Sequence, residues 1–479
     1  MMRSQIVPGK EDVVLGIPLS DFPDSVVRLT PQDQEYHATI WGRTGSGKSR
    51  LLQSIFLQHL SKGHAACILE PHHDLSFDTL SYLVEKGFFR DKSAYERLVY
   101  LDWGNGAYVP FNCLAGRGAP ETVALHALEA MLRVWPELRR APTFQTLFLS
   151  AMVVLIANHL PMTFLHQFLT DASFREGCLD HVDDPLILQS FARFGKVSGQ
   201  AQEAGSALRR AFLLSFNQLT RLTLSQPDCI INLRQLMDQG RSLIVNLGNV
   251  QDAETRRLIG ALLLVQIEQA ALSRTDLPPN RRRPWTVLID EWPSFAAVDG
   301  SIGSILDQTR KFGLRLYLAA QSTGQVSSDR LQAALENCRL NVAFGLGRES
   351  AVEQSRQIAT LDPALYRQDP VTGRPHLVST SEQFEGLAQD LQHLSPQEAY
   401  VKLHTDSVVK IRSLNVRDAK PDPSELAEVL ATYRATYQRT RTQAEAAIAR
   451  LTTPFSPTPD SATVRAPYTL FGQRPHGES

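Results

Sequence analysis

Residues 42–49 read Gly42, Arg43, Thr44, Gly45, Ser46, Gly47, Lys48 and Ser49. They satisfy every defined position of the phosphate-loop pattern G-x-x-x-x-G-K-[ST], whose glycines let backbone N–H groups point at a β-phosphate. In that pattern the lysine, here Lys48, reaches the β- and γ-phosphates, and the hydroxyl of Ser49 ligates Mg²⁺. These eight residues therefore predict a binding site for ATP, with Mg²⁺ as its metal.

The sequence on either side of this loop fits the same interpretation. Residues 37–41 are typical of a short strand, and residues 50–60 have the pattern of an amphipathic helix. A helix in that position turns its N-terminus, with its free N–H groups, toward the phosphates. A glycine-rich turn that matched the pattern by chance would not have both flanking elements in order.

A second motif offers a place for the metal and the attacking water. Residues 285–289 form a continuous apolar run, as expected of a buried parallel strand, and end in Asp290 and Glu291. Acidic residues at the carboxyl end of such a strand lie beside the phosphate loop in open α/β sheets. We expect Asp290 to hold Mg²⁺ through water and Glu291 to polarise the attacking water, which suits hydrolysis.

Three further residues are candidates for the site. Gln321 follows an apolar strand over 314–320, where it could touch the γ-phosphate or the attacking water; the alternative is a glutamine that caps a loop. Arg310 ends a predicted helix before that strand, and in a ring-forming ATPase it could reach the neighbour's nucleotide as an arginine finger. Arg348 is the competing candidate for that role, and the third alternative is that both arginines are solvated.

Composition narrows the class of protein. The 479 residues are 43% hydrophobic and 21% charged, as in ordinary globular proteins, and are enough for two or three domains. A formal net charge of −1 excludes a broadly basic surface, so any contact with nucleic acid must be local. The five cysteines are scattered without a C-x-x-C pair, which indicates reduced thiols.

The sequence also predicts where the protein is located in the cell. The longest apolar stretch, residues 147–160, is too short to cross a bilayer, and the N-terminus lacks the apolar segment of a signal peptide. We therefore expect no stable membrane span and a cytoplasmic location, with peripheral association at the inner membrane as the alternative.

His72, His73 and Asp74 could suggest a metal site, but adjacent histidines in an extended segment point apart. A role near the nucleotide or in coupling is the other interpretation of these residues.

The organisation along the chain predicts an α/β fold, a RecA-like core with a mainly parallel sheet, because strands and helices alternate. Helical periodicity replaces this alternation over 122–134, 143–157 and 201–222, which indicates an inserted all-α domain. The predicted parts are an N-terminal β segment 1–36, ATPase core 37–117, all-α insertion 118–225, ATPase core 226–420 closed by a hairpin over 399–416, a C-terminal helix 421–452 and a disordered tail 453–479.

Several of these segments together resemble the FtsK/HerA superfamily of ring-forming DNA motors. Within it they resemble most the coupling ATPases of conjugative type IV secretion, of the TraD/TraG type. The resemblance covers roughly residues 37–350. It rests on the phosphate loop and on residues 70–75, 101–103, 111–114, 288–292, 310–314 and 320–322. Glu70 and His73 stand where Asp and Gly are commoner in that family, and the membrane anchor usual in coupling proteins is not seen.

The resemblance implies a homohexamer that hydrolyses ATP and moves single- or double-stranded DNA through a central pore. It implies that the all-α insertion meets DNA or a relaxase, with secretion components as further partners. A motor of the HerA type that works with a nuclease in end resection or phage defence is the alternative. A scaffold whose nucleotide regulates assembly is an alternative from another class, against which Glu291 and Gln321 argue.

Overall fold

The computed structural model describes residues 9–19, 25–115, 118–192, 212, 214, 216–295, 301–326, 329–368 and 374–452. The expected disordered tail and most of the helix expected over 201–222 lie outside these residues. Within the described part of the chain, no helix is both long enough and apolar enough to cross a membrane.

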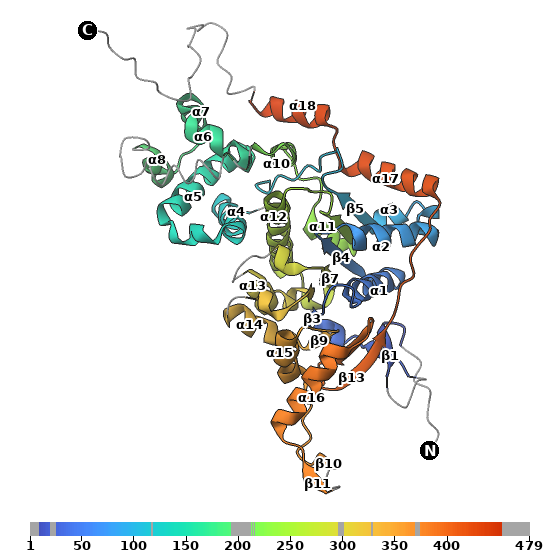
Figure 1. Ribbon diagram of the computed structural model, residues 1–479. Coiled ribbons are helices and arrows are strands. Elements are labelled where there is room, and N and C mark those ends of the chain that lie inside the picture. Colours follow the sequence, from blue (N-terminus) through green and yellow to red (C-terminus); the bar gives the residue numbers. More distant parts are fainter. Residues whose placement is uncertain are drawn as a thin grey trace, which may run out of the picture.

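A mixed sheet runs through the centre of the described structure (Figure 1). Its strand order is β2-β1-β13-β12-β9-β3-β8-β7-β4-β6-β5. The strands from β9 to β5 are parallel, whereas β12, β13, β1 and β2 add antiparallel pairs at one end. The strands are β1 Val13–Pro18, β2 Val27–Leu29, β3 Ala38–Trp41, β4 Ala65–Glu70, β5 Leu98–Asp102, β6 Ser242–Asn246, β7 Trp285–Ile289, β8 Leu314–Ala320, β9 Leu340–Ala343, β12 Glu398–Lys402 and β13 Val408–Ser413.

This arrangement confirms the predicted α/β class with a mainly parallel sheet. Strands β1 and β2, within the expected N-terminal β segment, extend the same sheet, and the expected closing hairpin is β12–β13. The division of the chain into separate domains stays a prediction.

Helices cover both faces of the sheet because its central strands are apolar on both sides. In β4, Ala66 and Ile68 face one core while Cys67 and Leu69 face the other. The first core is packed by α1 Lys48–Ser61, α2 Asp74–Glu85 and α17 Pro423–Tyr437. The second is packed by α11 Leu233–Gln239, α12 Ala253–Leu272, α13 Ser301–Gln308, α14 Asp329–Glu336, α15 Arg348–Ile358 and α16 Thr380–His393. A parallel sheet buried in this way leaves its carboxyl edge as the place for a ligand.

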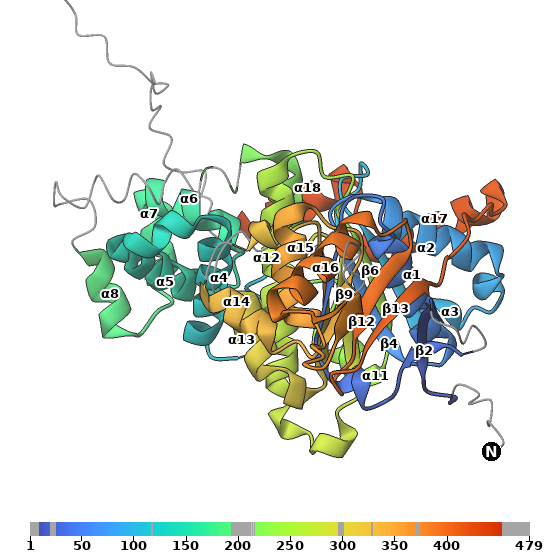
Figure 2. The ribbon, with the colours of Figure 1, turned by 60° about the horizontal axis from the view of Figure 1, so that its bottom comes forward.

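Residues 120–192 are helical where the structure describes them and lie to one side of the sheet in two views (Figures 1 and 2). The helices in this part and after it are α4 Pro120–Val134, α5 Pro142–Ala157, α6 Leu165–Thr170, α7 Ala172–Leu179, α8 Pro185–Ala192 and α10 Gln218–Leu224. Helix α4 packs on both α5 and α12, which joins this helical part to the apolar core behind the sheet.

One helix was predicted over residues 421–452, but the structure has two helices in this segment, α17 and α18 Arg441–Thr452. The break lies at Gln438–Thr440. There the backbone of Arg439 pairs with that of Tyr108, and the Arg439 guanidinium binds the Asp228 carboxylate at 2.9 Å. These contacts replace the helical hydrogen bonds that the Ala- and Arg-rich composition favours.

Two elements between α15 and β12 were not expected from the sequence. A small antiparallel hairpin, β10 Tyr366–Gln368 with β11 Pro375–Leu377, projects from the body of the molecule (Figure 1). Helix α16 then returns the chain to the sheet, and it begins with a Ser379 side chain that accepts the Glu382 N–H. The short helix α3 Ala94–Arg97 completes the fold before β5.

Candidate functional site

The sheet order brings the predicted site segments together. Strand β3 pairs with β8, and β8 pairs with β7. Because these strands are parallel, the residues that follow each of them emerge at the same edge of the sheet. The phosphate loop follows β3, Gln321 follows β8, and Asp290 with Glu291 follow β7. We call this edge the nucleotide edge.

The phosphate loop has the open conformation that its glycines allow. Gly45 and Gly47 have φ of 77° and 119°, where L side chains are strained. The loop is tied to the sheet where Arg43 N–H donates to the Gly345 carbonyl at 2.9 Å. Among the described residues no acceptor binds the N–H groups of Thr44, Gly45 or Gly47, and the Ser46 hydroxyl is buried without a partner. These free donors fit a phosphate group.

Lys48 is folded back over this loop. Its ammonium donates to the carbonyls of Gly42 at 2.6 Å and Arg43 at 3.2 Å. Burial lowers the pKa of Lys48, while the nearby carboxylates of Asp290 and Glu291 act in the opposite direction. The side chain therefore brings a positive charge to the place where the loop's free donors converge.

Ser49 and Asp290 form the predicted metal position. The Ser49 hydroxyl donates to an Asp290 carboxylate oxygen at 2.6 Å, and Asp290 is 7% exposed. A hydroxyl and a carboxylate supply the oxygen ligands that Mg²⁺ prefers, with water and phosphate oxygens completing its shell. The donor set fits Mg²⁺ held between the protein and a nucleotide.

Glu291 lies beside this pair in an unusual backbone conformation. Its φ and ψ are both 50°, a left-handed conformation that is uncommon for a residue other than glycine, and only 7% of the residue is exposed. Such conformations concentrate at functional sites. The carboxylate accepts a hydrogen bond from the side-chain amide of Gln325 at 2.8 Å.

Gln325 was not predicted as a site residue. The sequence analysis selected Gln321, but the side chain that contacts Glu291 is that of Gln325; Gln321 gives its backbone N–H to the Gln325 Oε1 at 3.2 Å and exposes its own side chain. The available signal was Ser322-x-x-Gln325, the pattern of a capping box. A role for Gln321 at the γ-phosphate stays a prediction.

Glu70 and His73 extend the nucleotide edge at the end of β4. The buried Glu70 carboxylate accepts the N–H groups of Leu75 at 2.8 Å and Ser76 at 2.5 Å at the start of α2. Burial raises the pKa of Glu70 to about 7, and the negative charge of Asp290 adds to this effect. His73 has a φ of 82°, and its Nδ1 lies 2.6 Å from the amide nitrogen of Asn246.

His72, His73 and Asp74 do not gather with a further ligand in the structure. Within the described ranges, no group of three His, Cys, Asp or Glu side chains could hold a metal ion. His73 instead stacks on Phe77, with ring centroids 5.0 Å apart. Its contacts connect α2 to β6.

Arg310 and Arg348 lie at opposite edges of the sheet. Arg310 precedes β8, whose seven residues place it about 20 Å from the nucleotide edge at the usual rise per residue. Its guanidinium rests over the Tyr36 ring at 4.9 Å. Arg348 follows β9 and lies on the nucleotide edge, but it pairs with Glu385 at 2.6 Å. Arg310 therefore cannot serve the nucleotide of its own chain.

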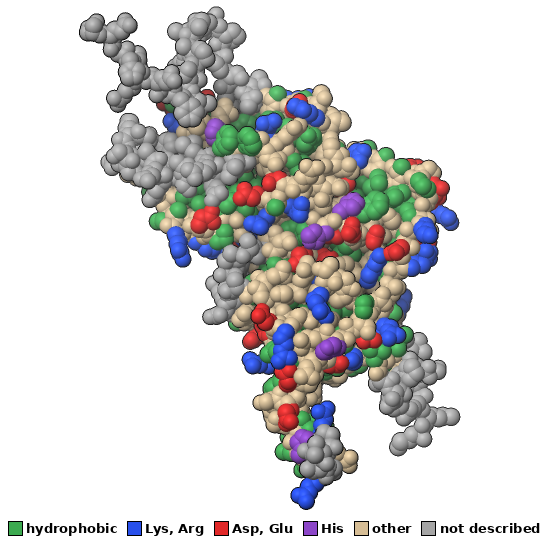
Figure 3. Space-filling view, in the orientation of Figure 1, with side chains coloured by type: hydrophobic (Ala, Val, Ile, Leu, Met, Phe, Trp, Pro, Cys, Tyr) green, Lys and Arg blue, Asp and Glu red, His purple; other side chains and the backbone are tan. Residues whose placement is uncertain are grey.

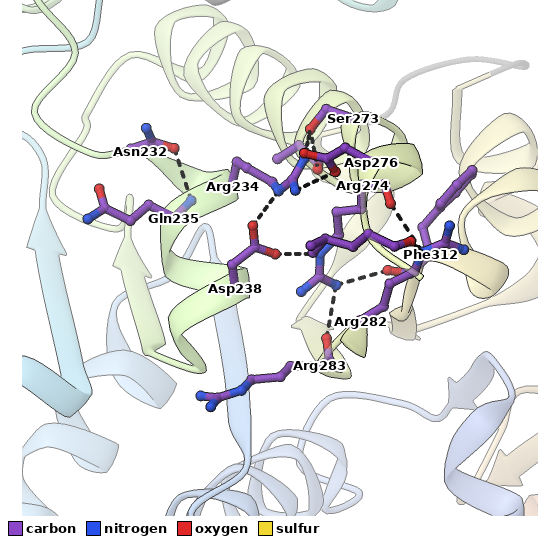
Figure 4. A network of polar contacts seen from close by, with 12 residues as sticks. Asn232, Arg234, Gln235, Asp238, Ser273, Arg274, Asp276, Arg282, Arg283 and Phe312 are labelled. Carbon is purple, nitrogen blue, oxygen red and sulfur yellow. Dashed lines mark hydrogen bonds and ion pairs between the residues drawn. The ribbon is translucent and has the colours of Figure 1, made fainter. Parts of the chain in front are cut away.

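A polar network holds the turn that carries Arg310 (Figure 4). Arg274 is fully buried; its Nε donates to Asp238 and its Nη1 donates to the carbonyls of Arg283 and Phe312, each at 2.9 Å. Arg282 donates to the Lys311 carbonyl, also at 2.9 Å. Arg282 and Arg283 also bind backbone carbonyls here: Arg282 donates to Leu277 and Arg283 donates to Gln239.

The sheet order, phosphate loop and acidic strand end define a RecA-like P-loop nucleotide-binding fold. No protein-family model matches the chain, and no curated protein is similar to it in sequence.

Solved structures match it in fold. The bacterial conjugative coupling protein TrwBdeltaN70, in an unbound monoclinic form, has a TM-score of 0.57 and 19% identity, covering 83% of this chain and 89% of that one. TrwB in complex with ADP and Mg²⁺ has a TM-score of 0.58 at 19% identity, over 82% of this chain and 89% of that one. VirB4 of Thermoanaerobacter pseudethanolicus has a TM-score of 0.53 at 13% identity, over 84% and 96%. The chain therefore has the fold of these solved structures.

Proposed function

We propose that this protein is an ATP-hydrolysing motor of the conjugative coupling type, which assembles as a ring and moves DNA through its central pore. The observation that carries the proposal is the contact of Ser49 with Asp290 at 2.6 Å, next to Lys48 and Glu291. The fold shared with TrwB, one structure of which is described as a complex with ADP and Mg²⁺, supports it.

Each site residue has a distinct part in hydrolysis. The loop N–H groups and Lys48 would bind the phosphates, and Ser49 with Asp290 would hold Mg²⁺, which would supply positive charge against the phosphate oxygens. Glu291 accepts a proton from the attacking water as the new bond from oxygen to the γ-phosphorus forms and the bond to the β-phosphate oxygen breaks. A protein that only bound nucleotide would have no need of a buried carboxylate beside the metal position.

Assembly into a ring is supported by the position of Arg310. In its own chain it lies at the edge of the sheet away from the nucleotide, on a turn held by the Arg274 network. A rigid, exposed arginine in that place suits a neighbour's nucleotide, where it would stabilise charge as phosphoryl transfer proceeds. We propose a homohexamer in which Arg310 acts in this way, with Arg348 as the competing residue.

Binding of DNA must come from a local surface. On the face shown in Figure 3, lysine and arginine side chains are interspersed with acidic ones, in keeping with a net charge of −1. A ring concentrates the basic side chains of several subunits along one pore, so phosphate contacts can be numerous without a basic chain. Contacts of that kind are independent of base sequence.

The test is ATP hydrolysis with and without single- and double-stranded DNA, combined with particle imaging to look for rings. We expect hydrolysis that DNA stimulates and ring-shaped particles in the presence of nucleotide or DNA. Hydrolysis that depends on a co-expressed nuclease would favour the HerA-type alternative. ATP binding with neither hydrolysis nor DNA binding would instead favour a nucleotide-regulated scaffold.

A further inference from the structure

Gln325 occupies a place in the site that no motif assigned to it. It belongs to the short 3-10 turn Thr323–Gln325, which follows β8 and reaches across to the loop after β7. Its side-chain Nε2 donates to Glu291 Oε1 at 2.8 Å. Glu291 thereby has one carboxylate oxygen held, and within the described residues no hydrogen bond is made to the other. That oxygen is free to accept a proton from water.

The Gln325 amide is itself fixed in orientation. Its Oε1 accepts the backbone N–H groups of Gln321 and Ser322, both at 3.2 Å. The Ser322 hydroxyl in turn accepts the Gly324 N–H at 3.1 Å, which completes a capping box. Because the oxygen is committed to these two donors, the amide nitrogen must point toward Glu291.

The 3-10 turn that carries Gln325 is also anchored by helix α15. The Thr323 N–H and hydroxyl both donate to the Ser350 hydroxyl of α15 at 3.2 Å. Thr323 is buried, whereas Gln325 is exposed at the nucleotide edge. An exposed glutamine would ordinarily sample several rotamers, but here its own turn and α15 restrict it. The hydrogen bond from Gln325 to Glu291 therefore does not depend on bound nucleotide.

We propose that Gln325 is a positioning residue, which holds the Glu291 carboxylate so that its free oxygen faces the attacking water. This inference rests on the proposed hydrolysis of ATP. A general base works best when a further group fixes its orientation, and small displacements of reacting groups are costly in rate. Glu291 needs such support because its left-handed backbone conformation is strained.

Two substitutions separate the donor from the turn. Gln325→Glu keeps an oxygen for the N–H groups of Gln321 and Ser322 but replaces the amide donor by a second carboxylate that repels Glu291. Gln325→Ala removes the donor without adding charge. Gln383→Glu is the matched control, since Gln383 lies on α16, is half-buried, and its side chain hydrogen-bonds, within the described residues, only backbone groups of Asp362 and Val378.

We expect both Gln325 variants to lower kcat for ATP hydrolysis by about tenfold to a hundredfold, as for other displaced catalytic groups. The KM for ATP and the Kd of a fluorescent ATP analogue should stay within about twofold, because Gln325 has no part in binding phosphates. Gln383→Glu should hydrolyse ATP at the parental rate. Thermal unfolding of each variant verifies that it is folded.

A double-mutant cycle on kcat distinguishes a positioning role of Gln325 from a merely structural one. In a Glu291→Gln background the base is gone, so adding Gln325→Glu should change kcat by less than about twofold. A full, additive loss in that background would overturn the proposal, as would Gln325 variants with parental kcat. If the parental chain hydrolyses no ATP, the proposed function falls together with this inference. If the parental chain hydrolyses ATP and the Gln325 substitutions leave kcat unchanged, only this inference is wrong and the proposed function stands.

Discussion

The Ser49 hydroxyl and the Asp290 carboxylate come from positions 241 residues apart and meet at 2.6 Å. A partly buried hydroxyl–carboxylate contact beside an ammonium group would be a costly arrangement if its only purpose were stability, because each group gives up hydration. We propose that at the nucleotide edge the contact serves to hold a divalent cation against phosphate oxygens.

The first prediction separates binding from hydrolysis. Lys48→Ala should abolish ATP turnover and weaken nucleotide binding, because the charge over the loop is lost. Glu291→Gln should still bind ATP but lose several orders of magnitude in turnover, since the water loses its base. Phosphate release and binding of a fluorescent ATP analogue measure the two properties. A Glu291→Gln variant that hydrolysed ATP at the parental rate would show that the base has been assigned wrongly.

The second prediction concerns the pKa of Glu70. Burial raises the pKa of Glu70 in the folded protein to about 7 from its ordinary value of 4.5, so the folded protein binds a proton more readily than the unfolded chain. The stability from protonated Glu70 is therefore fully present below about pH 4.5 and is lost as pH rises through about 7.

Glu70→Gln should remove this dependence. Between pH 5.5 and 8, the free energy of unfolding of the variant relative to the parent should rise by about 2 kcal/mol. Denaturant unfolding at the two pH values measures it, with Glu445→Gln on the exposed face of α18 as the control. A difference between variant and parent that did not change with pH would show that Glu70 titrates normally.

At this scale the sequence predicts residues that belong to local patterns. Lys48, Ser49, Asp290 and Glu291 each follow a strand in a recognisable motif, so their roles could be inferred before the fold was known. Gln325 could not be selected over Gln321, because the choice depends on a 3-10 turn that carries the later residue back to Glu291.

Among the elements, the turn before β8 shows how an arginine-rich loop becomes a fixed structure through its polar contacts. Arg274 is completely buried, and burial lowers the pKa of its guanidinium, while Asp238 opposes this effect. The buried charge is balanced by Asp238 and by the carbonyls of Arg283 and Phe312. The cost of leaving that charge unpaired makes the network sensitive to the loss of one member.

The third prediction tests this network. Asp238→Ala should destabilise the protein by about 3 kcal/mol, because it leaves the buried Arg274 guanidinium without its carboxylate. Glu445→Ala, which breaks the exposed pair of Arg441 and Glu445, should cost less than about 1 kcal/mol. Thermal and urea unfolding compare the two variants. Equal, small effects would mean that the network contributes little.

The elements that the sequence predicted correctly have a strong local pattern, such as the continuous apolar run of β7 and the helical periodicity of α4. The elements that it missed depend on contacts from distant parts of the chain. The break between α17 and α18 follows from the pairing of Arg439 with Tyr108 and Asp228, and no local signal marks it. The β10–β11 hairpin is a short, exposed element with little apolar pattern to reveal it.

On the scale of the whole molecule, the proposed ring is tested by mixing variants. Arg310→Ala should spare ATP binding and reduce hydrolysis, because the neighbour's nucleotide loses a positive charge. Mixed with Lys48→Ala subunits, it should recover part of the turnover, since each variant supplies across the interface what the other lacks. Hydrolysis by the mixture measures this recovery. Absence of recovery when both variants assemble normally would count against Arg310 and direct attention to Arg348.

The fifth prediction concerns DNA. Binding should be independent of sequence and should weaken steeply as salt rises, because phosphate contacts release counterions. Removal of residues 453–479 should leave both binding and its salt dependence intact, since the composition of that segment cannot support a packed core. Fluorescence anisotropy with labelled oligonucleotides measures both. A loss of binding on truncation would place the contact in the removed segment.

The central claim is that this fold and site form an ATPase that DNA stimulates. It is tested most directly by the rate of phosphate release from ATP as DNA is added to the assembled protein at low salt. Lys48→Ala serves as the blank. We predict measurable hydrolysis by the parental chain, with a rate that rises on addition of DNA. A parental chain that binds ATP and assembles, yet releases no phosphate with or without DNA, would contradict the claim.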